Sequence, residues 1–296
     1  MPRIDGAEDL FSLPGVAAEV AGLRARRPQA EAVVVKLNNG FSGQGNAILE
    51  LDNVADPLPT SKTTFIAGEE SWPTFSAKIE DEGAIVEELL RGEGVRSPSV
   101  QLRIAPAGTV EILSTHDQIL GGPEGQVYLG CRFPASEEYR SAIVDEARRV
   151  GEILAGEGVI GSFGIDFVVV PGDTAYLSEI NLRLGGTTHP YWMARLATGA
   201  TYDEDRGELV AEGRPVRYVA TDNIKSAALA TWTPAQVIAT VEDAGLAFDP
   251  ATRTGVTLHL LGAVPGYGKL GATCIGPTAE AADDLYVRLV DLLTNR

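Results

Sequence analysis

Residues 162–183, SFGIDFVVVPGDTAYLSEINLR, carry the most informative pattern in the chain. Its two halves are rich in β-branched and aromatic residues, and a Pro-Gly-Asp-Thr sequence typical of turns separates them. The pattern predicts a β-hairpin. If Val170 pairs with Ala175, the numbers of paired residues sum to 345, and Asp166 then lies opposite Glu179.

The predicted hairpin gathers polar side chains on one face. Glu179, Asn181 and Arg183 share that face because strand side chains alternate, and Gly164 leaves room opposite Asn181. Carboxylates at directly paired positions repel, and Mg²⁺, which favours one or two carboxylates plus phosphate oxygens, would relieve that repulsion. The alternative is a solvent-facing polar stripe on an ordinary hairpin. A register slip of one residue would remove Asp166 from the face.

A glycine-rich loop, GFSGQG at 40–45, separates two strand-like runs at 32–37 and 46–51. Its unhindered backbone N–H groups can close over phosphates, with Lys36 on the preceding strand as a cation. The loop is not a P-loop, because Asn-Ala follows the last glycine where Lys-Ser/Thr is required. It is not a dinucleotide fingerprint either, because it leads into a strand instead of a helix. The alternative is a plain flexible turn.

Local patterns predict the remaining elements, and several strands follow one another as hairpins, which favours α+β over a doubly wound sheet. Residues 52–76 are expected to be irregular or to contain a short helix, and the acidic segment 201–213 to be a surface element or a boundary. Further strands are expected at 84–90, 98–105, 109–115, 254–264 and 270–275, and helices at 16–27, at 136–156 with Ser136 as cap, after a Thr233–Gln236 capping box, and at 278–293.

The order of these features resembles the ATP-grasp family of carboxylate–amine ligases. A strand with Lys36, the glycine loop and two more strands are followed by a mixed segment and by Asp166 with Glu-x-Asn-x-Arg at 179–183. Residues 178–190, SEINLRLGGTTHP, most resemble the pheganomycin-type peptide ligases of that family. The resemblance covers about residues 30–200 and is weaker beyond. It implies an α+β ATP-grasp fold, in which two α+β subdomains grip ATP, with a C-terminal α/β extension.

Four parts are expected along the chain on this basis. A helical segment at 1–30 precedes one ATP-grasp subdomain with the glycine flap at 31–96. The second subdomain, at 97–200, carries the hairpin, and a C-terminal α+β domain fills 201–296.

The resemblance also implies which residues contact ATP. Lys36 would contact the nucleotide phosphates, and the loop at 40–45 would form a mobile flap above them. Glu93 would hold the ribose, although its surroundings do not match the family's spacing cleanly. The flap residues implied are Gly40, Ser42, Gly43 and Gly45, and the hinge residues at the adenine edge are Glu87, Glu88 and Leu90.

The implied chemistry is formation of a C–N bond with release of ADP. Asp166, Glu179 and Asn181 would bind one or two Mg²⁺ ions, or Mn²⁺. The substrate carboxylate attacks the γ-phosphate, and an amine then displaces phosphate from the acyl-phosphate. Lys36 and Arg183 are the implied catalytic residues, because phosphoryl transfer needs mainly positioning and charge neutralisation. The substrates implied are ATP and a small-molecule, amino-acid or peptide carboxylate and amine.

One departure from the family pattern leaves alternatives open. Family members usually carry a preceding domain with a nucleotide-contacting lysine, whereas the residues before Ala32 contain no lysine. The chain is then a fragment of a longer enzyme, a reduced ligase, or one that works as a homodimer or with a partner that supplies this part. The alternative function is a nucleotide-binding ATP-grasp module, inactive alone and regulatory or partner-dependent.

Composition narrows the class of protein. The chain has 296 residues and a formal net charge of −17, which argues against nucleic acid and anionic membranes as partners. No long apolar run or signal sequence is present, and Cys131 and Cys274 offer no disulfide framework, so we expect a cytoplasmic protein. His189 is expected either to line the site or to be an ordinary loop residue. His116 and His259 are expected to be core or surface residues of strands.

Overall fold

The structure is a computed structural model that describes residues 2–40, 43–51, 58, 62–172 and 174–295. The chain forms two compact units. We call residues 2–95 with 120–128 the N-terminal unit, and residues 96–119 with 129–296 the C-terminal unit. The mixture of antiparallel sheets and helices confirms the α+β class. The division into four parts stays a prediction.

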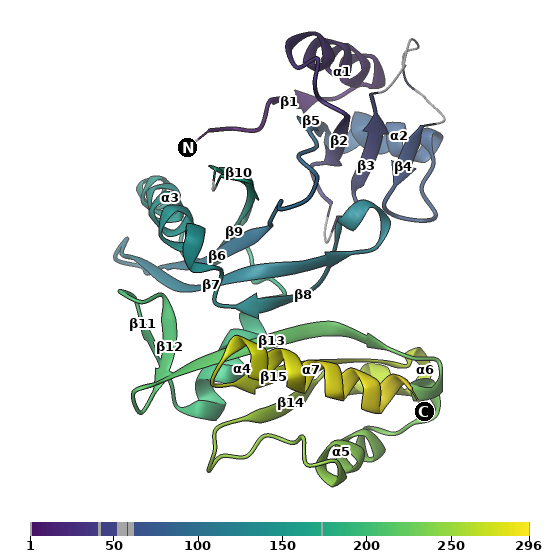
Figure 1. Ribbon diagram of the computed structural model, residues 1–296. Coiled ribbons are helices and arrows are strands. Elements are labelled where there is room, and N and C mark those ends of the chain that lie inside the picture. The colour runs from purple at the N-terminus through teal and green to yellow at the C-terminus, as the bar shows by residue number, and fades with distance from the viewer. Residues whose placement is uncertain (1, 41–42, 52–57, 59–61, 173, 296) are drawn as a thin grey trace. The chain divides into compact units, whose positions relative to one another are not determined.

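The N-terminal unit is a five-stranded antiparallel sheet with two helices, α1 (Leu13–Arg26) and α2 (Trp72–Glu82). Helix α1 begins where the Ser12 hydroxyl accepts a hydrogen bond from the backbone N–H of Gly15, with proline in the first turn. Helix α2 lies beside the sheet where residues 52–76 were expected to be largely irregular (Figure 1). In spatial order the strands are β1 (Gly6–Leu10), β5 (Ala84–Glu88), β2 (Ala32–Leu37), β3 (Asn46–Glu50) and β4 (Thr63–Phe65).

The two faces of this sheet differ in what covers them. Val33 and Val35 of β2 belong to the core formed with both helices. Val34 and Lys36 alternate with them and therefore lie on the opposite face, where Val34 packs with Ile48. Strand alternation thus presents Lys36 on the face that the helices do not cover.

The C-terminal unit is built on one long antiparallel sheet. Strand β15 (Lys269–Gly276) pairs with both β13 and β14 (Gly255–His259). The main spatial order is β10 (Thr174–Asn181), β9 (Gly161–Val170), β6 (Pro98–Ile104), β7 (Val110–Gly121), β8 (Val127–Phe133), β13 (Arg214–Lys225), β12 (Glu208–Ala211) and β11 (Thr201–Asp203). The acidic segment near residues 201–213 is therefore a hairpin, β11–β12.

Four main helices complete this unit. Helix α3 (Glu137–Gly156) starts at the predicted Ser136 cap and packs on β6 and β9. Helix α5 (Pro234–Asp243) starts at the predicted capping box, and α7 (Ala279–Thr294) lies along β13 and β15 (Figure 1). Helix α4 (Thr188–Thr198) follows the hairpin directly. Short helical turns at Pro123–Gly125, Ala228–Thr231, Leu261–Ala263 and Val264–Tyr267 connect other elements.

The predicted pairing of Val170 with Ala175 is wrong. Val170 pairs with Thr174, so the paired numbers near the turn sum to 344. A bulge between Leu177 and Glu179 adds one residue to β10 and restores the sum to 345 beyond it. Asp166 therefore does lie opposite Glu179, because the offset at the turn and the bulge cancel.

The elements that were not predicted from sequence include strands β1, β4, β8, β11, β12 and β13 and helix α4. Helix α4 includes the Thr188-His189 end of a segment that was expected to be a loop. Within the part of the chain that the structure describes, no helix has both the length and the apolar content required to cross a membrane.

Candidate functional site

The predicted metal-binding residues come together on strands β9 and β10. Asp166 lies in β9 between Glu179 of β10 and Ser99 of β6. Two residues away, Gly164 lies between Asn181 and Gln101. Asp166 and Asn181 are half-buried and Glu179 is exposed, so this end of the hairpin is open to solvent and to a ligand.

A chain of hydrogen bonds joins the polar side chains. Asp166 Oδ1 accepts from Gln118 Nε2 at 2.9 Å, and Asp166 Oδ2 accepts from Asn181 Nδ2 at 3.0 Å. Arg183 Nη2 donates to Asn181 Oδ1 at 2.9 Å. Arg183 lies two residues beyond Asn181, at the exposed end of the hairpin. The structure thus brings Asp166, Asn181 and Arg183 into direct contact, with Glu179 at the paired position.

The glycine at position 164 makes room for a side chain of the sheet itself. A Cβ atom at Gly164 would lie 2.7 Å from Oε1 of Gln101. Gln101 is buried and donates a hydrogen bond of 3.0 Å to the hydroxyl of Ser99. The space at Gly164 is therefore taken by a buried amide instead of being left open beside Asn181.

The N-terminal unit carries the predicted phosphate-binding residues. Lys36 Nζ lies 2.6 Å from Glu87 Oε2, and each side chain is about one-fifth exposed or less. These two residues come from the neighbouring strands β2 and β5, on the face opposite the helices. Glu88, the next residue of β5, points the other way and forms an ion pair of 3.0 Å with Arg27. Lys36 and Glu87 therefore form a partly accessible charged pair on this face.

The glycine loop is closed at its base by backbone hydrogen bonds. Leu37 N–H donates to the Gly45 carbonyl at 2.9 Å, and Gly40 N–H donates to the Leu37 carbonyl. Gly43 has a φ of 76°, and a Cβ there would lie 2.3 Å from the carbonyl oxygen of Gln126. A larger residue at position 43 would meet both backbone strain and a clash, so glycine is required. Phe41 and the predicted flap residue Ser42 lie outside the described residues.

The remaining predicted nucleotide contacts follow strand β5. Leu90 is half-buried, just after Leu89, whose N–H donates to the Ala32 carbonyl at 3.0 Å. Glu93 lies in an exposed turn between two glycines. The structure therefore keeps 87–90 against the sheet and places Glu93 away from it, and their roles toward a nucleotide stay predictions.

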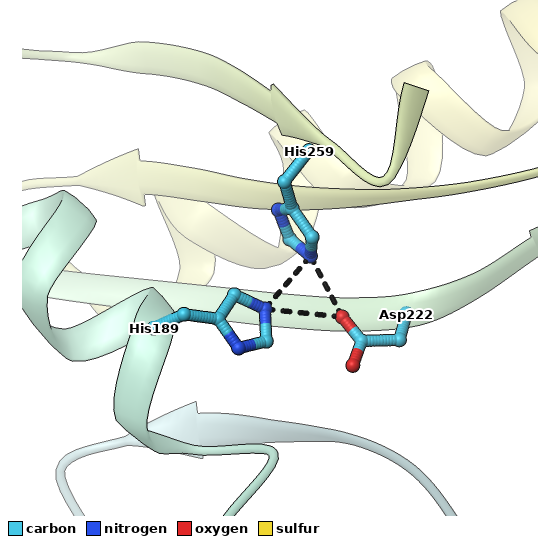
Figure 2. Close-up of side chains that lie close together, drawn as sticks. All are labelled: His189, Asp222 and His259. Carbon is cyan, nitrogen blue, oxygen red and sulfur yellow. Dashed lines mark hydrogen bonds and ion pairs between the residues drawn. The ribbon is translucent and has the colours of Figure 1, made fainter. Parts of the chain in front are cut away.

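A second cluster of side chains lies in the C-terminal unit, and no local sequence pattern indicates it. His189 Nε2 and His259 Nε2 are 3.2 Å and 2.7 Å from Asp222 Oδ1, and 3.0 Å from each other (Figure 2). Burial disfavours the charged form of Asp222, but hydrogen bonds from the two imidazoles outweigh this and lower its pKa below the ordinary value. His259 is thus not the plain core or surface residue that was expected. The three residues are separated by dozens of positions, so no spacing motif links them.

The other candidates from sequence are core residues. His116 is fully buried, and its Nε2 lies 2.6 Å from the Tyr218 hydroxyl. Burial lowers the pKa of His116 to about 3, which keeps the ring neutral at physiological pH. Cys131 and Cys274 are both buried, and burial raises the pKa of Cys274 to about 12. This confirms the expectation that His116 is a core or surface residue of a strand.

Comparisons with known proteins cover nearly the whole chain. The ATP-grasp domain family matches residues 8–187, and the PGM1 C-terminal domain family matches residues 236–289. An L-propargylglycine–L-glutamate ligase of Streptantibioticus cattleyicolor is 37% identical over 294 residues, which is 97% of this chain and 59% of the relative. The chain therefore spans less than two thirds of that relative's length.

Solved structures show the same fold at low identity. A biotin carboxylase of Campylobacter jejuni matches with a TM-score of 0.63 at 13% identity, covering 100% of this chain and 66% of that one. An N5-carboxyaminoimidazole synthase of Aspergillus clavatus matches with a TM-score of 0.60 at 15% identity, covering 99% of this chain and 69% of that one. Together with the family matches, these findings confirm the fold that the order of motifs implied.

Proposed function

Because the chain belongs to the ATP-grasp family, we propose that it takes part in an ATP-dependent ligation of a carboxylate to an amine through an acyl-phosphate. The observation that carries the proposal is the cross-strand pair of Asp166 and Glu179, with Asn181 and Arg183 on the same hairpin. This is the oxygen-rich, arginine-flanked arrangement that phosphoryl transfer requires.

The residues of the hairpin fit a magnesium ion. Both oxygens of Asp166 accept hydrogen bonds from neutral amides, and a carboxylate oxygen can accept such a bond and still be a ligand of a cation. Glu179 is exposed at the paired position, and its carboxylate would repel that of Asp166 unless a cation lies between them. Asn181 would add its amide oxygen in exchange for the bond to Arg183. Mg²⁺ bound here would neutralise charge on phosphate oxygens.

The basic residues would each act on phosphate groups. Lys36 would exchange its ion pair with Glu87 for a nucleotide phosphate, since a multiply charged phosphate is the stronger partner. Arg183 would turn from Asn181 toward the transferring phosphoryl group and hold it bidentately. The backbone N–H groups of the glycine loop would cover the phosphates and keep water away.

Amino acids are the substrate class that we propose. The relative from Streptantibioticus cattleyicolor is named for joining L-propargylglycine and L-glutamate. At 37% identity the same class of substrate, two L-amino acids or short peptides, is the first to test for this chain. The acidic net charge of −17 does not oppose this, because the proposed phosphate site is a local one.

The experiment that tests the proposal measures ADP and phosphate release by the full chain with ATP and Mg²⁺, against panels of L-amino acids and dipeptides. We expect turnover that requires both a carboxylate and an amine substrate. ATP binding by calorimetry without turnover, until another protein is added, would instead support the partner-dependent module. Absence of both binding and turnover in folded protein would overturn both.

A further inference from the structure

The three side chains His189, Asp222 and His259 meet at one point, each from a different element of the C-terminal unit (Figure 2). His189 lies in the first turn of α4, Asp222 in β13 and His259 at the end of β14. Their donor atoms, two Nε2 and one Oδ1, lie 2.7–3.2 Å from one another. This cluster is separate from the residues proposed above for Mg²⁺ and ATP.

No placement of protons on the two imidazoles makes all three contacts between these donor atoms favourable. If both Nε2 atoms carry a proton, both donate to Asp222 Oδ1, but two N–H groups then face each other at 3.0 Å. If only one carries a proton, the lone pair of the other faces the carboxylate oxygen at 3.2 Å or less. Every state with neutral imidazoles leaves at least one contact between like groups. A cation at the centre would accept all three lone pairs at once.

The backbone is shaped to hold one of these imidazoles. His259 is paired with Gly271 of β15, and a Cβ atom at Gly271 would lie 2.1 Å from His259 Nε2. The ring therefore lies directly across the glycine, and any side chain at 271 would displace it. The exposed fractions of the His189, Asp222 and His259 side chains are 40%, 27% and 12%, so the cluster is anchored on one side and reachable on the other.

We propose that His189, Asp222 and His259 bind a divalent transition-metal ion, with Zn²⁺ as the reference ion and an open coordination position. Two imidazoles and one carboxylate are the donors that zinc and its neighbours prefer, whereas Mg²⁺ prefers oxygen donors alone. Three protein ligands leave at least one position for water or for a nitrogen or oxygen atom of a substrate. The proposal does not depend on the ligase function.

The distances fit this class of ion. Zinc lies about 2.0–2.1 Å from nitrogen and oxygen ligands, so its donor atoms lie about 3.0 Å apart at right angles and about 3.3 Å apart in a tetrahedron. The observed separations of 3.0 Å between the imidazoles and 3.2 Å from His189 to Asp222 fall in this range. The 2.7 Å contact between His259 and Asp222 would open by a few tenths of an ångström.

The test is metal binding by the full chain, freed of metal with a chelator and measured without ATP. Calorimetry with Zn²⁺ is expected to show one site with a dissociation constant in the micromolar range or below. Co²⁺ is expected to give visible absorption bands of four- or five-coordinate intensity, and Zn²⁺ but not Mg²⁺ is expected to raise the melting temperature.

Substitutions identify the ligands. His259→Ala and Asp222→Asn should each weaken Zn²⁺ binding about a hundredfold or more and abolish the Co²⁺ bands, since each removes a direct ligand. His189→Ala is the second variant, because this half-exposed residue can be replaced without opening the core. Glu179→Gln is the matched control and should bind Zn²⁺ as the native chain does. Binding that is absent in native protein, or unchanged in folded His189→Ala and His259→Ala variants, would overturn the proposal.

Discussion

The two clusters of the C-terminal unit differ in their donor atoms and in how the chain assembles them. The hairpin cluster offers only oxygen donors, Asp166, Glu179 and Asn181, within sixteen residues on two adjacent strands. The imidazole cluster, formed by His189, Asp222 and His259, spans 71 residues and three elements that are not neighbours in sequence. One cluster is made by strand pairing and the other by tertiary packing.

The donor atoms of the two proposed cation sites differ enough for each site to select its own ion. Hard oxygen donors favour Mg²⁺, and imidazoles favour zinc-like ions, so each ion has a preferred place. The sites also respond to different changes in the chain. A substitution on the hairpin should not affect zinc binding, and a substitution in the imidazole cluster should not change Mg²⁺ affinity.

The largest effect is expected for Glu179→Gln. Removing this carboxylate leaves the proposed Mg²⁺ with one charged ligand, and turnover of ATP should fall by about 10³-fold, the scale of a lost electrostatic contact to developing charge. Steady-state ADP release at several Mg²⁺ concentrations measures this. The control is Glu152→Gln, at an exposed position of α3, which should be silent. Full activity in Glu179→Gln would contradict the proposal that Glu179 binds the Mg²⁺ required for turnover.

Arg183→Gln should have the next largest effect, a loss of about 10²-fold in kcat with a smaller change in KM for ATP. The reason is that a guanidinium acting on the transferring group contributes more to the transition state than to binding. Arg183→Lys should recover only part of the rate, because it keeps the positive charge but loses the two parallel N–H donors of the guanidinium. Equal losses in kcat and in ATP affinity would contradict this role.

His116, which lies outside the imidazole cluster, is expected to make the free energy of unfolding depend on pH. His116 is neutral in the folded protein because burial lowers its pKa to about 3, whereas the unfolded chain takes up the proton near pH 6.5. The unfolded state therefore binds more protons below pH 6.5, and stability is lost as the pH falls. Between pH 7 and pH 5 this residue should cost about 2 kcal/mol of unfolding free energy.

Denaturant unfolding at several pH values measures this slope. His116→Asn does not titrate, so the variant should be less stable at pH 7 yet show a flatter decline toward pH 5. Parallel slopes for native protein and variant would mean that His116 is not the group responsible.

The smallest effect is expected for Gly271→Ala. The added methyl group would push the His259 ring aside, and Zn²⁺ affinity should fall about tenfold, or about 1.4 kcal/mol. Zinc calorimetry measures it, with Gly156→Ala as control, since a Cβ at Gly156 meets nothing within 4 Å. ATP turnover supported by Mg²⁺ should stay unchanged in both. A change in turnover equal to the change in zinc affinity would mean that the two clusters are coupled.

The elements that sequence predicted best have strong local signals. Strand β2 was placed at its observed bounds, and α3 and α5 were found through their caps, Ser136 and Thr233. Helix α4 was missed because Gly185, Gly186 and Thr187 precede it and Thr188 begins it, a composition typical of loops. Strand β13 was missed because polar residues interrupt its apolar pattern, which only pairing with β8 and β15 explains.

The hairpin shows how a local pattern can predict the right contact through a wrong register. Pairing of Asp166 with Glu179 was expected from Val170 opposite Ala175, and it occurs because the bulge at Ser178 compensates for a tighter turn. A bulge inserts one extra residue into a strand. It has no characteristic composition here, so the sequence pattern does not reveal it. The predicted contact is therefore right only because two departures from the predicted register cancel.

Three features of this protein follow from residues that are close together in the chain. They are the ordered motifs of the family, the strand alternation that exposes Lys36, and the oxygen donors on one hairpin. Tertiary structure alone decided the meeting of His189, Asp222 and His259 and the fit of the imidazole over Gly271. The physical reason is that pairing of adjacent strands follows a period of two residues, whereas the approach of a helix to distant strands depends on how whole elements pack.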